Sequence, residues 1–204
     1  FIKALQDFKE ARRQAAIEEI FAQITGREEE IKLLPYQEIR DKLRGLEKSS
    51  KYLKDIPLDA IVGSVGRYHE FTRSFLPKKT VSEDRWARIM TETAGLSGLP
   101  PIEVYKISEV YFVKDGNHRV SVARQLGNET IQAYITEVKV NVPITRDSSP
   151  DQIIIKAEYS HFLEQTKIDQ LRPEADLKLT KPGAYPTRLE HIEIHRYYMG
   201  LEQN

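Results

Sequence analysis

The chain has 204 residues, with 31 basic against 31 acidic side chains and no cysteine. The absence of cysteine excludes disulfides, thiol catalysis and cysteine-ligated metal centres. The balanced charge lacks the basic excess of a dedicated nucleic-acid binder, although a local basic face is compatible with it. No apolar run approaches the roughly 18 residues that span a bilayer, and no secretory signal is visible. We therefore expect a cytoplasmic protein without membrane contact.

The N-terminal segment predicts an amphipathic helix over residues 1–25, with Gly26 as its C-terminal cap. Its expected apolar face, with residues at three- and four-residue steps, consists of Leu5, Phe8, Ala16, Ile20, Phe21 and Ile24. We expect this face to pack on the core or on a partner, including a second copy of the chain. A short helix is expected at 36–44, and a polar connection at 45–54.

The middle of the chain predicts short strands alternating with helices. Strands are expected at 56–62, 102–107, 110–114 and 131–138. Helices are expected at 82–93, with Ser82 as N-cap, and from about His118 to Leu126. A link rich in glycine and proline occupies 95–101. Beyond the last strand we expect a helix opening at Ser149-Pro150, an ordered loop at 171–186 and a final element at 188–201.

These elements predict an α/β (α+β) protein with a small mixed sheet. The core is expected at 51–142, with helical extensions at 1–50 and 143–204. The helical pattern is already under way at Phe1, and no closing element precedes Asn204. We therefore expect the chain to be a piece of a longer protein.

The stretch from Asp115 to Arg119, Asp-Gly-Asn-His-Arg, lies where an expected strand turns into a helix. The first amides of a helix have no partner within it and favour an anion, and Gly116 lets a ligand approach the backbone. Arg119 can hold two phosphate oxygens, and His118 can donate to phosphate or move a proton. Asp115 can hold magnesium, act as a base or cap the turn. The pattern predicts a phosphate site.

The same turn also has a purely structural interpretation. Asn117 is a good N-cap residue, and Asp-Gly is an ordinary turn pair. Arg119 can form a salt bridge on the surface. The local pattern alone leaves both interpretations open, because short glycine-containing motifs are common.

The order of the elements around this turn resembles the ParB/sulfiredoxin-like domain. The matching blocks are IPLDAI at 56–61, GLPPIEV at 98–104, DGNHR at 115–119 with LG at 126–127, and IQAYI at 131–135. They cover roughly residues 51–140. The whole chain also resembles bacterial proteins that carry this domain near their N-terminus. The resemblance implies a ParB/sulfiredoxin-like core between the two helical extensions.

Members of this family bind nucleotide phosphates at the turn: partition proteins bind and hydrolyse CTP, and sulfiredoxins and a free-serine kinase use ATP or ADP. The resemblance implies that Gly116, Asn117, His118 and Arg119 line such a site, with His118 and Asp115 as catalytic candidates of an NTPase or phosphotransferase. Asn117 replaces the sulfiredoxin cysteine, which excludes sulfinic-acid repair. Asn117-His118 also replaces the Glu-Arg pair of partition proteins, so the His-Arg version favours ATP or ADP over CTP, with magnesium.

Ser64 and Arg67 follow the first expected strand, in GSVGR at 63–67. In the family this region faces the phosphate turn, so one hypothesis is that both residues complete the pocket, with Arg67 as a second phosphate clamp. The other interpretation is a strand-ending turn with a surface arginine.

Two further patterns suggest other partners. The first is a locally basic run diluted by acids, consisting of Arg67, Arg73, Lys78, Lys79, Arg85 and Arg88. This run could meet DNA phosphates or a nucleotide, or form a solvated face of mixed charge. The family resemblance gives a DNA-associated partition or regulatory protein of the ParB type, without catalysis, as the alternative function. A structural interaction module is the third possibility. The second pattern is His191 and His195, which would share a helix face but lack the further ligands of a zinc site.

Overall fold

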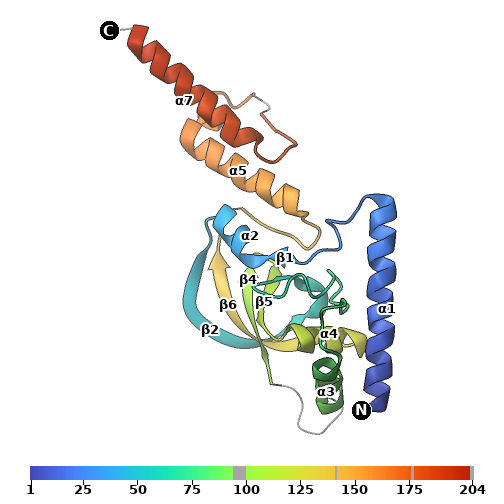
Figure 1. Cartoon of the computed structure of the whole chain (residues 1–204). Coiled ribbons are helices and arrows are strands. Elements are labelled where there is room, and N and C mark those ends of the chain that lie inside the picture. Colours follow the sequence, from blue (N-terminus) through green and yellow to red (C-terminus); the bar gives the residue numbers. More distant parts are fainter. Residues whose placement is uncertain (94–99, 141, 176, 203–204) are drawn as a thin grey trace.

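The computed structural model describes residues 1–93, 100–140, 142–175 and 177–202. It confirms the expected α/β class, with a mixed sheet and helices before and after it (Figure 1). The helices are α1 (Ile2–Thr25), α2 (Tyr36–Lys42), α3 (Glu83–Thr93), α4 (Asn117–Gln125), α5 (Pro150–Thr166), α6 (Ile168–Leu171) and α7 (Ala184–Glu202). The strands are β1 (Leu34–Pro35), β2 (Leu46–Pro57), β3 (Ile61–Ser64), β4 (Ile102–Ile107), β5 (Val110–Asp115) and β6 (Thr130–Lys139).

The six strands form one sheet in the order β1-β3-β5-β4-β6-β2. The pairs β1/β3, β3/β5 and β4/β6 are parallel, and the pairs β4/β5 and β2/β6 are antiparallel. Because β3 and β5 are parallel neighbours, their carboxyl ends lie at the same edge of the sheet. The loop after Ser64 therefore meets the turn after Asp115.

Apolar side chains fill both faces of the sheet. On one face, Phe8 of α1 and Trp86 of α3 belong to the same core cluster as Val113, and the Phe8 and Trp86 ring centroids are 5.5 Å apart. On the other face, Phe112 packs with Tyr36 of α2 and with residues of α5. Alternate residues of β5 point to opposite faces, so this strand contributes to both clusters. β5 and the turn that follows it are thus held from two sides.

The C-terminal helices extend away from the sheet (Figure 1). α5 begins with the expected cap, in which the Ser149 hydroxyl and the Gln152 side chain bond to each other's backbone amides. α7 packs on α5 through Tyr185, whose ring centroid lies 5.4 Å from that of Phe162. Within the described ranges, every helix is too short or too polar to cross a bilayer.

Three local predictions are wrong. The segment 45–54, expected to be a polar connection, forms most of β2, which is paired with β6 by backbone hydrogen bonds. Nearly all side chains of β2 are exposed, so its sequence shows no alternation of apolar residues. The strand expected at 56–62 is interrupted by a 3-10 turn at Leu58–Ala60, where the chain passes from β2 to β3. The final helix begins at Ala184, inside the expected loop at 171–186. Most of the expected link at 95–101 lies outside the described residues.

The face of α1 is predicted only in part. Phe8 is buried as expected, and Leu5 and Ala16 are partly buried. Ile20, Phe21 and Ile24 are exposed, and the core is contacted instead by the alanine side of the helix. The buried side chains of α1 are Ala4, Phe8, Ala11, Ala15 and Ala22. The small alanine side chains let α1 approach α3 and the neighbouring loops closely. The larger apolar residues lie on the opposite side of the helix and point outward.

Candidate functional site

A small pocket of about 150 Å³ lies where the loop after β3 meets the turn between β5 and α4. Of the residues predicted for the site, the structure brings Arg67, Asp115, Gly116, Asn117, His118 and Arg119 together around it. Ser64 is not among the lining residues. The lining is completed by Gly66, Arg85, Ile89 and Lys114. Arg85 and Ile89 come from α3, and sequence spacing gave no signal that this helix would reach the turn.

The helix α4 begins without a side-chain cap. Its N-cap residue is Gly116, in a left-handed conformation with φ 112°, and Asn117 is already the first helical residue. The structural interpretation of Asn117 as N-cap is therefore wrong. The glycine is required for a second reason, since a Cβ there would lie 2.5 Å from Cγ2 of Ile102. The first amides of α4 are left without the acceptor that an N-cap side chain would provide.

Asn117 and Ser64 tie the two loops together through one carbonyl group. The Asn117 Nδ2 donates to the Gly66 carbonyl over 3.3 Å, and the buried Ser64 hydroxyl is 2.5 Å from the same oxygen and 3.1 Å from the Val113 carbonyl. Ser64 thus holds the pocket together from behind rather than lining it. The Asn117 Oδ1 is buried and has no partner within the described residues. It can accept a hydrogen bond from a hydroxyl group or a water molecule.

His118 is 4% exposed, and its ring packs edge-on against Phe71, with ring centroids 5.4 Å apart. Its buried Nε2 has no hydrogen-bond partner in the part of the chain that is described. Burial, together with the positive charges of Arg85 and Arg67, lowers the pKa of His118 to about 4. At neutral pH the imidazole is therefore neutral, and Nε2 is either a donor or an acceptor according to the tautomer.

Arg119 is held by the protein itself. Its guanidinium donates to the carbonyl oxygens of Pro100 and Pro101 over 2.7 and 2.8 Å, and it forms an ion pair with Asp115. This side chain is 14% exposed. Arg119 thus fixes the chain before β4 against the turn and leaves only part of its donors for a ligand.

The other cations of the pocket are more accessible. Arg85 is exposed, and within the described ranges no carboxylate forms an ion pair with it. Arg67 contacts Glu70 over 3.3 Å with its side chain 52% exposed. Lys114 lies 3.7 Å from Glu103 and 5.5 Å from the centre of the Tyr105 ring. An exposed ion pair such as that of Arg67 with Glu70 is weak, and Arg85 has no such pair within the described residues. Arg67 and Arg85 are therefore the side chains best able to turn toward an incoming anion.

The remaining sequence candidates do not form sites in the structure. His191 and His195 lie exposed on α7, and no group of three or more metal-binding side chains occurs within the described ranges. Two members of the basic run are engaged within the protein. Lys78 pairs with Glu19 over 3.1 Å, and Arg73 is partly buried, which lowers its pKa to about 10.

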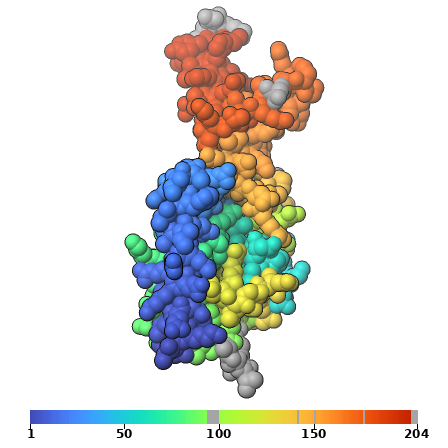
Figure 2. Space-filling view, turned by 90° about the vertical axis from the view of Figure 1, so that its right-hand side faces the viewer, coloured from blue at the N-terminus to red at the C-terminus, as the bar shows by residue number. Residues whose placement is uncertain are grey.

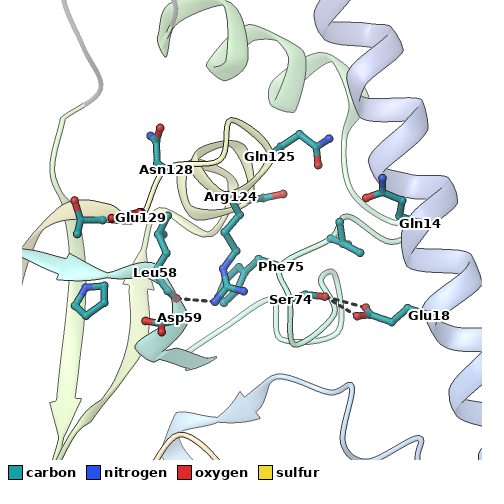
Figure 3. A pocket seen from close by; sticks show the side chains of 14 residues that line it. Gln14, Glu18, Leu58, Asp59, Ser74, Phe75, Arg124, Gln125, Asn128 and Glu129 are labelled. Carbon is teal, nitrogen blue, oxygen red and sulfur yellow. Dashed lines mark hydrogen bonds between the residues drawn. The ribbon is translucent and has the colours of Figure 1, made fainter.

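A larger groove of about 800 Å³ lies along the C-terminal half of α4 (Figure 3). Arg124 crosses it, donates to the Leu58 carbonyl over 2.6 Å and lies 5.4 Å from the centre of the Phe75 ring. Ser74 donates to the Glu18 carboxylate on the opposite wall. These contacts join α4, the 3-10 turn and α1. Size alone does not make this groove the functional site, because Glu18, Asp59 and Arg124 already serve internal contacts.

Comparison with known proteins adds little to this geometry. No protein-family model and no curated protein matches the chain. The crystal structure of sulfiredoxin from Arabidopsis thaliana is similar to part of it, with 20% sequence identity over 41% of this chain and 83% of that chain. The TM-score of this match is 0.33. A likeness at this level carries no argument about family or activity, so the site is interpreted from its own residues.

Proposed function

We propose that the pocket between β5 and α4 binds the phosphate group of a nucleotide, as the family resemblance of the turn implies. The observation that carries the proposal is the uncapped N-terminus of α4, which opens into a pocket lined by three arginines and one lysine. Free amides and the helix dipole attract an anion, and Arg67 and Arg85 supply mobile positive charge. In the tautomer that carries its proton on Nε2, neutral His118 can donate a hydrogen bond to the phosphate without acting as a cation.

The size of the pocket restricts what it holds. About 150 Å³ suits a phosphate group, whereas pockets for whole small-molecule ligands usually measure about 300–1,000 Å³. The sugar and base would therefore lie on the surface beside the pocket. The unpartnered Asn117 Oδ1 is suited to accept from a hydroxyl group or from a metal-bound water.

Asp115 is the carboxylate that lines the pocket, and its side chain is 67% exposed. One carboxylate does not make a free-standing metal site, but magnesium commonly binds through one or two carboxylates together with substrate phosphates and water. Asp115 therefore fits magnesium that arrives with a nucleotide. The reaction class to search for is transfer or hydrolysis of a terminal phosphate, where positioning and charge stabilisation do most of the work.

The decisive experiment is calorimetric titration with ATP, ADP, CTP and GTP, with and without magnesium. Arg67→Ala and Arg85→Ala should each weaken binding by about tenfold, as expected for loss of one charge-assisted hydrogen bond. Arg88→Ala is the matched control, because Arg88 is exposed on α3 but does not line the pocket. Arg119→Ala is a less specific probe, since it also releases Pro100 and Pro101.

Two results would contradict the proposal. One is that the folded protein binds no nucleotide, and the other is that Arg88→Ala loses as much affinity as Arg67→Ala and Arg85→Ala. DNA binding that weakens steeply with added salt, without nucleotide binding, would favour the DNA-associated alternative instead. Phosphate release measured on the same samples tests for catalysis separately from binding.

A further inference from the structure

The helix α1 is apolar on two opposite sides. The alanine side, with Phe8, packs on the core. On the other side, large side chains follow one another at helical spacing and are 57–78% exposed. We call this set the isoleucine face; it consists of Ile17, Ile20, Phe21 and Ile24. The spacing of three, four and seven residues places all four on one strip of the helix surface.

Nothing within the described part of the chain covers the isoleucine face. α1 lies on the outside of the molecule, and in Figure 2 it runs along the surface that faces the viewer. Contiguous exposed apolar side chains usually mark an interaction surface. A helix that is apolar on both sides is typically buried on both sides.

Charges at the two ends of the isoleucine face indicate what covers it. Arg13 lies one turn before Ile17, and Glu28 follows the end of the helix, four residues after Ile24. Both are exposed, and neither forms an ion pair within the residues that the structure describes. These two charges of opposite sign thus stand at opposite ends of the face, with Glu10 near the first and Arg27 next to the second. Such a surface is complementary to a copy of itself that runs in the opposite direction.

We propose that α1 pairs antiparallel with the α1 of a second copy of the chain, around a two-fold axis between Ile20 and Phe21. This axis places Ile17 opposite Ile24 of the second copy and Arg13 near its Glu28. A parallel pair would instead bring Arg13 to Arg13 and Glu28 to Glu28, which repel each other. The interface rests on one helix from each copy and lies at the small end for protein complexes, so the dimer depends on concentration.

The first test is sedimentation equilibrium of the unmodified chain over micromolar to millimolar concentrations. We expect a monomer–dimer equilibrium that shifts toward monomer by at least tenfold in Ile20→Glu. The matched control is Ile194→Glu on α7, where the isoleucine is 55% exposed, nearly the same as the 57% of Ile20. The control should leave the equilibrium unchanged, and circular dichroism should show both variants folded.

Single cysteines then test the direction of pairing, because the chain has none of its own. Ile20→Cys lies next to the axis and should form a disulfide-linked dimer under mild oxidation. Ile24→Cys should not link to itself, since the two copies would lie about 10 Å apart along the axis at a rise of about 1.5 Å per residue. Ile24→Cys mixed with Ile17→Cys should link.

The proposal is independent of nucleotide binding, and each outcome decides it. A monomer at every concentration overturns it, as does a dimer that survives Ile20→Glu. Efficient self-linking of Ile24→Cys would show a parallel pair and would overturn the arrangement. A charge exchange, Arg13→Glu combined with Glu28→Arg, should restore dimerisation that either substitution alone weakens.

Discussion

Acid should destabilise this protein through His118. The ordinary pKa of 6.5 falls to about 4 in the folded chain, because the ring is buried against Phe71 and faces the charges of Arg85 and Arg67. The unfolded chain therefore binds a proton more tightly than the native state does. The stability that neutral His118 contributes is complete above pH 6.5 and is lost as the pH falls toward about 4.

The size of the effect follows from the shift. A shift of about 2.5 units at about 1.36 kcal/mol per unit amounts to about 3 kcal/mol in total, of which about 2 to 3 kcal/mol is lost between pH 7.5 and 4.5. Other groups also titrate in this range, so the informative quantity is the difference between the wild type and His118→Gln. The variant should lose about 2 to 3 kcal/mol less on acidification than the wild type.

Urea unfolding in phosphate-free buffers provides the measurement, with the single tryptophan, Trp86, as a buried fluorescent reporter. His69→Gln is the control, since His69 is exposed and should change nothing. Equal losses in the wild type and His118→Gln would refute the reasoning. Pyrophosphate bound beside His118 should raise its pKa and reduce the acid loss, which links this measurement to the proposed site.

Two further predictions compare like residues in different surroundings. Gly116→Ala should destabilise the fold by about 2 kcal/mol or more, because the backbone there is left-handed and the added Cβ would clash with Ile102. Gly66→Ala should cost far less stability, because no atom lies within 4 Å of its added Cβ. Thermal unfolding of both variants measures the difference. Phe8→Ala should lower the free energy of unfolding by about 3–5 kcal/mol, because the ring is fully buried. Phe21→Ala should lower that of the monomer by less than about 0.5 kcal/mol, because the Phe21 side chain is 64% exposed. Equal losses would contradict the assigned faces of α1.

Elements with strong local signals could be predicted from the sequence. Ser82 and Ser149 cap the helices they were expected to cap. The strand pair expected at 102–107 and 110–114 is found at 102–107 and 110–115. Both kinds of signal act between residues close together in the chain. β2 carries no such signal, because an exposed edge strand is held by its backbone bonds to β6.

The sequence by itself determined the site turn: a glycine at the strand–helix junction followed by Asn117, His118 and Arg119, each within a few bonds of the next. The tertiary structure alone decided what these residues can do. It placed α3 beside the turn so that Arg85 reaches the pocket, buried His118 and made it neutral, and directed Arg119 to Pro100 and Pro101. These properties depend on burial and on charges distant in the chain, which no local pattern of residues encodes.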